Sequence, residues 1–263
     1  MTQIALSPLI RSGLCLMRAG RWDDATQLLA AARADTGEER LALAAALAEV
    51  AVDQDFAQQT DDAGARLVVL AEALSETPDA FIAWDFAFLQ LRKEYGVALL
   101  ATDRDSGADL AERAAHLAKT APDDSRSGHA HFYAGVIADN LLEQPEAAFA
   151  AYTTALDLGE RSADDLLISL ALRHLGDHAH TAGDLPLARI HWERSTELRQ
   201  KIGHLLGTLA QQTLLAVLAR DEGNPAASKA LATEVNRWSH QASLPWLQAQ
   251  SAALTNDQKR SSS

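Results

Sequence analysis

Small and large residues recur in the stretch 172–203 at the offsets needed to pack two helices closely. Leu175 and Trp192 are bulky, whereas Gly176 and Ala188 are small. Two helices whose axes approach to about 8–10 Å need small side chains where they cross and large ones beside the crossing. The stretch therefore predicts a helical hairpin, and we expect Gly176 and Ala188 to form the crossing pair.

The turn of this hairpin is also encoded. Gly183 stands between the two helical segments, and a left-handed turn residue at the end of a helix is usually glycine. Asp184 follows as a cap for the second helix, with Pro186 in its first turn. A capping box is expected in the same way from Thr36 to Glu39.

The same spacing recurs along the chain. Residues 6–34 repeat the order of small and large positions, and residues 132–160 and 214–238 repeat it less completely. Three small residues that occupy one position of the motif lie 40 residues apart: Ala148, Ala188 and Ser228. We therefore expect hairpins of one kind to be stacked along the chain.

Composition supports an all-α fold. Of the 263 residues, 48% are apolar, and these are mostly alanine and leucine. The β-branched and aromatic residues that strands prefer are few, with only 5% aromatic. We expect one helical-repeat domain over residues 1–254, ending in a helix from Pro245 to about Leu254, and a disordered tail over 255–263. The predicted helix pairs are 5–19 with 22–34, 38–57 with 61–75, 78–101 with 105–120, 124–142 with 145–158, 163–182 with 185–202, and 204–222 with 225–240.

The segment LGDHAHTAGDLPLARIHWERSTELRQKIG resembles the tetratricopeptide repeat in its Leu-Gly, Gly-Asp, Ala-Arg and Glu-Leu-Arg elements. The chain is most similar to the longer-period arrays of bacterial transcriptional activators and of kinesin-light-chain-type proteins. The resemblance covers residues 6–34 and 131–222, and it implies an all-α solenoid with a right-handed superhelical course. It also implies a concave groove, lined by the first helix of each hairpin, that holds a peptide or a partner helix.

Carried onto this chain, the resemblance places six residues in the groove: Arg173, Asp177, His180, Tyr133, Asn140 and Arg220. An alternative is that Arg173 and Asp177 simply pair with each other at the i,i+4 spacing of a helix surface. Family members that clamp a peptide carboxylate use lysine and asparagine at defined positions. Only Arg173, Asn140 and Arg220 approach that chemistry here, so we do not expect the family's clamp.

Nine histidines invite a test for metal binding. His174 and His178 stand at i,i+4, the separation at which two imidazoles can share a metal. No glutamate follows His174 to complete the HExxH pattern, and the alternative is that both are polar surface histidines. We therefore expect neither a metal nor another cofactor.

The segment 81–95 gathers five aromatic residues on one predicted helix. Aromatic residues at this density usually form core, which is the interpretation we favour. The alternative is an apolar wall for a ligand, with polar contacts from Asp85, Arg92 or Lys93.

Charged residues narrow the class of partner. The net charge is −13, with 23 basic residues dispersed among 36 acidic ones, so nucleic acid is not an expected partner. The basic residues Arg189, Arg194, Arg199 and Lys201 are interleaved with Glu193 and Glu197. They predict a solvated helix face, and the alternative is an anion-binding patch. The pairs Asp61-Asp62, Asp123-Asp124 and Asp164-Asp165 stand at predicted helix starts, where carboxylates act as caps.

Two further features of the sequence bear on cellular location and on the reactivity of the single thiol. No apolar run is long enough to span a membrane, and no signal segment opens the chain, so we expect a cytoplasmic protein without a membrane partner. Cys15, the single cysteine, falls inside the first predicted helix, where we expect a buried and unreactive thiol.

Three functions remain open from the sequence. The first is a non-catalytic adaptor that binds a protein or peptide in the groove, with its oligomeric state undetermined. The second is a sensor module for a small molecule or short peptide, which the aromatic helix would support. The third is an enzyme with a helical-shell pocket, for which the histidines would be the only support.

Overall fold

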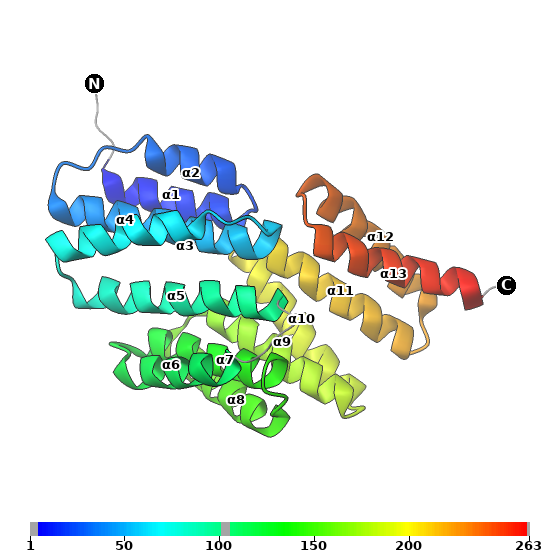
Figure 1. The fold of residues 1–263 in the computed structure, drawn as a ribbon. Coiled ribbons are helices and arrows are strands. Elements are labelled where there is room, and N and C mark those ends of the chain that lie inside the picture. Colours follow the sequence, from blue (N-terminus) through cyan, green and yellow to red (C-terminus); the bar gives the residue numbers. More distant parts are fainter. Residues whose placement is uncertain (1–4, 101–105, 262–263) are drawn as a thin grey trace. The chain divides into compact units, whose positions relative to one another are not determined.

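The computed structural model describes residues 5–100 and 106–261, and their side chains up to residue 255. These residues form thirteen helices and no strand (Figure 1). The helices are α1 Leu6–Arg18, α2 Trp22–Ala30, α3 Gly37–Gln58, α4 Ala63–Glu76, α5 Ala80–Leu100, α6 Gly107–Thr120, α7 Asp124–Asn140, α8 Pro145–Ser162, α9 Asp165–Thr181, α10 Leu185–Lys201, α11 Leu205–Asp221, α12 Pro225–Gln241 and α13 Pro245–Ser261.

The predicted fold class, an all-α solenoid of consecutive helical hairpins, is confirmed. Each predicted helix has a counterpart whose ends lie within a few residues of the expected ones. The last helix differs most, because its backbone continues to Ser261, past the expected end at Leu254 and into the stretch predicted as a disordered tail. None of the described helices is long and apolar enough to cross a membrane.

The chain divides into two compact units, residues 1–151 (unit 1) and residues 152–263 (unit 2), with the division inside α8. The prediction of one continuous domain over residues 1–254 stays a prediction. In unit 1, a core cluster centred on Leu41, Leu70 and Leu89 joins α3, α4 and α5. In unit 2, Ala188 and Trp192 of α10 pack in one cluster with Leu218 of α11.

A regular turn ends each helix from α7 to α12. One residue per turn has a left-handed backbone, and these residues follow one another every 20 positions: Glu143, Ala163, Gly183, Gly203, Gly223 and Ser243. Gly183, with φ of +81°, is the left-handed turn residue that the sequence predicted. The helices α9 to α13 are each 17 residues long, so two of these helix-turn units make up the 40-residue repeat.

The residue after the left-handed position caps the next helix in four of these turns. The side chains of Asp164, Asp184, His204 and Asn224 each accept a hydrogen bond from the backbone N–H three residues later. The capping box of Thr36 and Glu39 is present as well. Capping thus accounts for Asp164, and for Asp123, which accepts from the Arg126 backbone N–H at 2.8 Å. Asp62 precedes α4 but makes no side-chain capping hydrogen bond, so the expected cap is not formed there.

The expected crossing pair was assigned wrongly. A Cβ atom placed on Gly176 would lie 2.4 Å from Cδ1 of Trp192, so glycine makes room for the indole of Trp192. Ala188 is fully buried and belongs to one cluster with Trp192, Ala179 and Leu218. Gly13 is related in the same way to Leu29, at the same separation in sequence. The glycine of this motif therefore accommodates a large residue near the middle of the second helix.

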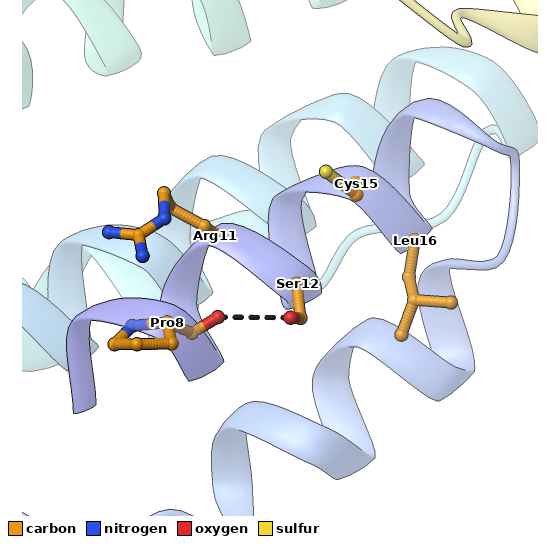
Figure 2. A pocket seen from close by; sticks show the side chains of 5 residues that line it. All are labelled: Pro8, Arg11, Ser12, Cys15 and Leu16. Carbon is orange, nitrogen blue, oxygen red and sulfur yellow. Dashed lines mark hydrogen bonds between the residues drawn. The ribbon is translucent and has the colours of Figure 1, made fainter. Parts of the chain in front are cut away.

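The prediction of a buried thiol at Cys15 was also wrong, because this side chain is exposed. Helix α1 buries Leu6, Gly13 and Met17, and Cys15 lies two positions after Gly13, about 200° around the helix. Figure 2 shows it on the outer face of α1 beside Arg11, together with Pro8, Ser12 and Leu16.

Candidate functional site

In unit 1, the groove candidates Tyr133 and Asn140 both contact aromatic side chains of α5. The ring of Tyr133 makes edge contacts with Phe88, Tyr95 and Phe132, at centroid distances of 5.2, 5.6 and 5.6 Å. Asn140 donates from Nδ2 to the hydroxyl oxygen of Tyr95 at 2.7 Å. Burial raises the pKa of the Tyr133 hydroxyl. Both residues thus serve the packing of α7 on α5.

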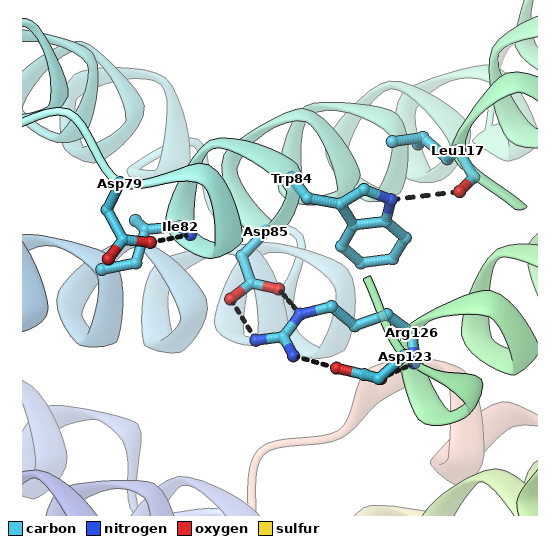
Figure 3. Close-up of polar contacts among 7 residues, drawn as sticks. All are labelled: Asp79, Ile82, Trp84, Asp85, Leu117, Asp123 and Arg126. Carbon is cyan, nitrogen blue, oxygen red and sulfur yellow. Dashed lines mark hydrogen bonds and ion pairs between the residues drawn. The ribbon is translucent and has the colours of Figure 1, made fainter. Parts of the chain in front are cut away.

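The aromatic segment of α5 is mainly core, as favoured from the sequence. Trp84, Phe88 and Tyr95 are buried. The rings of Trp84 and Phe88 stack at 5.1 Å, and the indole Nε1 of Trp84 donates to the backbone oxygen of Leu117 at 3.0 Å (Figure 3). Phe81 is the exception, because it is exposed and lies beneath the guanidinium of Arg126.

The polar residues beside these rings are all engaged in ion pairs. Asp85 binds Arg126 through both carboxylate oxygens, at 2.7 and 2.9 Å (Figure 3). Arg92 lies 2.5 Å from Glu49. Lys93 approaches Asp61 at 3.9 Å. A ligand-facing wall on α5 would have to compete with these pairs.

A partly buried polar pair, Trp22 and Asp53, lies near Arg92. The indole Nε1 of Trp22 donates to Oδ2 of Asp53 at 2.7 Å. Burial raises the pKa of the Asp53 carboxyl, although this hydrogen bond and the charge of Arg92 act against the rise. The group joins α2 to α3 and leaves the hydrogen-bonding capacity of Trp22 satisfied.

In unit 2, His180 and Arg220 meet at one carboxylate. Nε2 of His180 lies 2.9 Å from Oδ2 of Asp221, and Nε of Arg220 donates to Oδ1 of Asp221 at 2.8 Å. The hydrogen bond from Arg220 lowers the pKa of the Asp221 carboxyl, and His180 adds to this effect. Asp221 was not among the residues predicted from the sequence, where its position next to Arg220 was the only signal for it.

Arg173, His174 and Asp177 lie together on α9. The Nη1 atom of Arg173 is 3.0 Å from Nε2 of His174 and 3.8 Å from Oδ2 of Asp177. Because guanidinium nitrogens only donate, Nε2 of His174 is the acceptor, which assigns the ring proton to Nδ1, 3.7 Å from Asp177. The i,i+4 ion pair considered from the sequence is therefore formed, at a long distance.

The two histidines considered as metal ligands flank one tyrosine. His174 stacks on the ring of Tyr152 at 4.7 Å, and His178 meets its edge at 5.9 Å. Burial, followed by the positive charges of Arg173 and Arg199, keeps the pKa of His174 well below its usual value. Among the side chains that the structure describes, no group of three or more His, Cys, Asp or Glu is arranged to hold a metal ion.

The most unusual residue of this region is Arg199 of α10. It is only 4% exposed, and its Nε and Nη2 atoms are buried without a hydrogen-bond partner. Burial lowers the pKa of Arg199 to about 9; the charge of Arg173 contributes, whereas Asp177 opposes the shift. We call Arg173, His174, Asp177 and Arg199 the arginine cluster.

The assignment of Arg199 to a solvated helix face was wrong. Arg189, Arg194 and Lys201 do form exposed pairs, with Glu222, Glu160 and Asp165. Arg199 instead continues the buried stripe of α10, which comprises Ala188, Trp192, Ser195 and Arg199 at positions i, i+4, i+7 and i+11. This helical register was the signal that could have identified it.

Helix α11 provides the space for Arg199. Gly207 lies opposite, and a Cβ atom on it would be 2.3 Å from Nη1 of Arg199. One turn away, Gln211 donates to Oγ of Ser195 at 2.9 Å, and Ser195 donates to the backbone oxygen of Ser169 at 2.6 Å. The interface of α10 and α11 therefore changes from an apolar layer at Trp192 to a polar one that ends at Arg199.

Comparisons with known proteins identify a solved structure with a similar fold. No protein-family model matches the chain, and no curated protein sequence matches it. Among solved structures, it is similar to a signal transduction ATPase with numerous domains from Pyrococcus horikoshii, a protein described as having a tetratricopeptide repeat sensor. The TM-score is 0.53 at 15% identity; the match covers 94% of this chain and 38% of that one. The present chain is thus an all-α helical-repeat protein with the fold of a tetratricopeptide-repeat array.

Proposed function

We propose that this chain is a non-catalytic scaffold that binds a protein or peptide partner at the arginine cluster of unit 2. The observation that carries this proposal is Arg199, whose buried guanidinium leaves two nitrogen atoms without acceptors. A buried donor without a partner costs about 1–3 kcal/mol, and more when it is charged. Such a cost is typical of sites where a ligand completes the hydrogen bonding.

The surroundings of Arg199 fit a surface that meets a partner. The side chains of Arg173 and Asp177 are 29% and 33% exposed, so a partner can touch them directly. They lie on α9, the first helix of its hairpin, as the groove residues of the resemblance do. Tyr133 and Asn140 support the proposal less, because their contacts with α5 already explain them.

A regulatory sensor for a short peptide or small molecule is the second candidate. It is favoured by the Pyrococcus horikoshii protein, in which tetratricopeptide repeats are described as a sensor. In both cases the partner would be held by charge and hydrogen bonding at Arg173 and Arg199. With a net charge of −13, we propose no nucleic-acid partner.

Partner capture by wild type and by Arg173→Glu tests the proposal. Both proteins are immobilised, the partner is captured from an extract of the source cells, and its affinity for each is then titrated. We expect Arg173→Glu to weaken binding about tenfold, the loss of one charge-assisted hydrogen bond worth about 1.5 kcal/mol. The melting temperature should not fall, because the new carboxylate replaces a positive charge that acts on Arg199.

Arg194→Glu is the matched control. Arg194 is on α10, is 48% exposed and pairs with Glu160 at 2.9 Å, so the same charge reversal takes place outside the arginine cluster. We expect its affinity for the partner to equal that of wild type. Equal affinities for wild type and Arg173→Glu would instead move the binding surface away from the cluster.

A further inference from the structure

The two unpartnered atoms of Arg199 form a specific pair. In a guanidinium group, Nε–H and one N–H of Nη2 point in the same direction, so together they can bind both oxygens of one carboxylate. In Arg199 both of these atoms are buried and neither has an acceptor. The side chain thus presents an empty bidentate fork.

Other arginines of this chain use the same two atoms on carboxylates. Arg126 binds Asp85 through Nε and Nη2, at 2.7 and 2.9 Å (Figure 3). Arg237 binds Glu234 in the same way, at 3.1 and 2.6 Å. Arg189 places its Nε and Nη2 on the two oxygens of Glu222. Arg199 has the equivalent donors without the carboxylate.

The charge of the arginine cluster matches a monoanion. Arg173 and Arg199 carry two positive charges, and Asp177 carries one negative charge. His174 is held neutral by burial and by the neighbouring positive charges, which keep its pKa low. The cluster therefore has an excess of one positive charge, which one carboxylate neutralises and a phosphate dianion would overcompensate.

A carboxylate that binds Arg199 has to pass the side chains around its buried guanidinium. Asp177 lies 3.8 Å from Nη1 of Arg173, so these two side chains can separate without breaking a short hydrogen bond between them. On the side of α11, the guanidinium itself fills the space that Gly207 leaves, because an added Cβ would lie 2.3 Å from its Nη1 atom.

We propose that the arginine cluster is a carboxylate-binding site, in which Arg199 holds both oxygens of one acidic group of the partner and Arg173 adds a second positive charge. This inference rests on the proposed function and names the chemistry of its partner. The carboxylate belongs to an acidic side chain or to the C-terminal end of a peptide. Since Arg199 lies on the second helix of its hairpin, the site differs from a clamp built on first helices.

Titration of the whole chain with small carboxylates tests the proposal. The Nε–H signals of ¹⁵N-labelled arginine are recorded by NMR at constant ionic strength, and the Arg199 signal is identified by its absence in Arg199→Met. The probes are the α-amide of N-acetylglutamic acid, with its carboxylate on the side chain, and N-acetylglycine, with a terminal carboxylate. Inorganic phosphate and chloride are the comparison anions.

We expect at least one carboxylate to shift the Arg199 signal saturably, with an affinity about tenfold or more above that of phosphate. The carboxylate that binds more tightly identifies the source. An Arg199 signal that moves with neither carboxylate, or that responds best to phosphate, would overturn the proposal. Arg199→Lys retains the charge but lacks the fork, so a probe binding to it as tightly as to wild type would also contradict the assignment.

Thermal melts give a second readout that a merely structural arginine would not produce. In chloride buffer, Arg199→Met should melt at a higher temperature than wild type, because it removes a buried charge without a partner. The better carboxylate should raise the melting temperature of wild type and of Arg194→Met, but not that of Arg199→Met. A lower melting temperature for Arg199→Met than for wild type would show that the arginine stabilises the fold.

The two proposals can fail separately. If carboxylates bind Arg199 but Arg173→Glu captures the partner normally, the carboxylate site stands and the partner surface lies elsewhere. If Arg173→Glu loses the partner but no carboxylate reaches Arg199, the surface stands and its ligand chemistry is different.

Discussion

Gly176 of α9 lies directly against the indole of Trp192 on α10, so closely that a Cβ atom on the glycine would be 2.4 Å from both Cδ1 and Nε1 of the ring. The same Nε1 donates to the backbone oxygen of Arg173 at 2.9 Å. The fully buried ring is therefore fixed by a steric fit on one side and by a hydrogen bond on the other. Arg173 is a member of the arginine cluster, so the packing of the hairpin also supports the candidate site.

Gly176→Ala should therefore destabilise the protein by about 1–3 kcal/mol, because an added methyl group overpacks a rigid ring. Trp192→Ala should cost more, about 3–5 kcal/mol. Urea unfolding measures both changes. The control is Gly64→Ala in α4, where a Cβ would meet only the end of Lys93 at 3.8 Å or more. It should gain up to about 1 kcal/mol from helix propensity. Equal stabilities for Gly176→Ala and wild type would contradict the contact.

The left-handed turns allow a second prediction. Ala163 has a φ of +53°, which costs a residue with a Cβ about 1–2 kcal/mol, whereas Gly183 occupies the equivalent turn at +81°. Ala163→Gly should recover part of that cost and raise the melting temperature. Gly183→Ala should lower it, although no atom lies within 4 Å of the added Cβ. Shifts of the same sign in the two variants would rule out backbone strain as the cause.

The helices and their caps could be predicted from the sequence because they depend on local rules. Thr36, Gly183 and Asp184 act through neighbours in the chain, and these assignments are confirmed. Gly176 was paired with the wrong residue, because spacing alone does not tell which side chain of the second helix reaches it. Arg199 was misassigned because a charged residue is usually exposed. Its helical register with Trp192 places it on the buried face of α10.

Among the groove candidates, too, contacts within one helix could be predicted from the sequence, whereas contacts between helices could not. Arg173 and Asp177 share a helix, and their i,i+4 spacing was enough to bring them together. The partner of His180 is Asp221, which is 41 residues away in the chain. Such a contact depends on how α9 and α11 are arranged within unit 2, and the pattern of a single repeat does not contain that information.

The pH dependence of stability provides a third prediction. The pKa of His174 is lowered in the folded protein, so the unfolded chain binds more protons below about pH 6.5. Stability should be fully present above that pH and should fall as the pH decreases, by at most about 1.4 kcal/mol per pH unit for one histidine. His131 and His191 shift in the same direction through burial and contribute to the same slope.

His174→Phe separates the contribution of His174 from the others. Phenylalanine keeps a ring against Tyr152 but does not titrate. The loss of stability between pH 7.5 and pH 5.5, measured by urea unfolding, should therefore be smaller in His174→Phe than in wild type. An unchanged loss would assign the pH dependence to the remaining histidines and carboxylates.

The last prediction concerns the contact between Gly207 and Arg199. A Cβ on Gly207 would lie 2.3 Å from Nη1 and 2.8 Å from Cδ of Arg199, and 2.7 Å from Nδ1 of His204. Gly207→Ala should therefore cost about 1–3 kcal/mol in wild type. It should cost about 1 kcal/mol less in Arg199→Met, where the more adaptable methionine replaces the guanidinium. The collision with His204 is common to both backgrounds, so a double-mutant cycle by urea unfolding isolates the contact with Arg199. Additive effects would show that Arg199 does not occupy the space left by the glycine, and the carboxylate site would lose its support from α11.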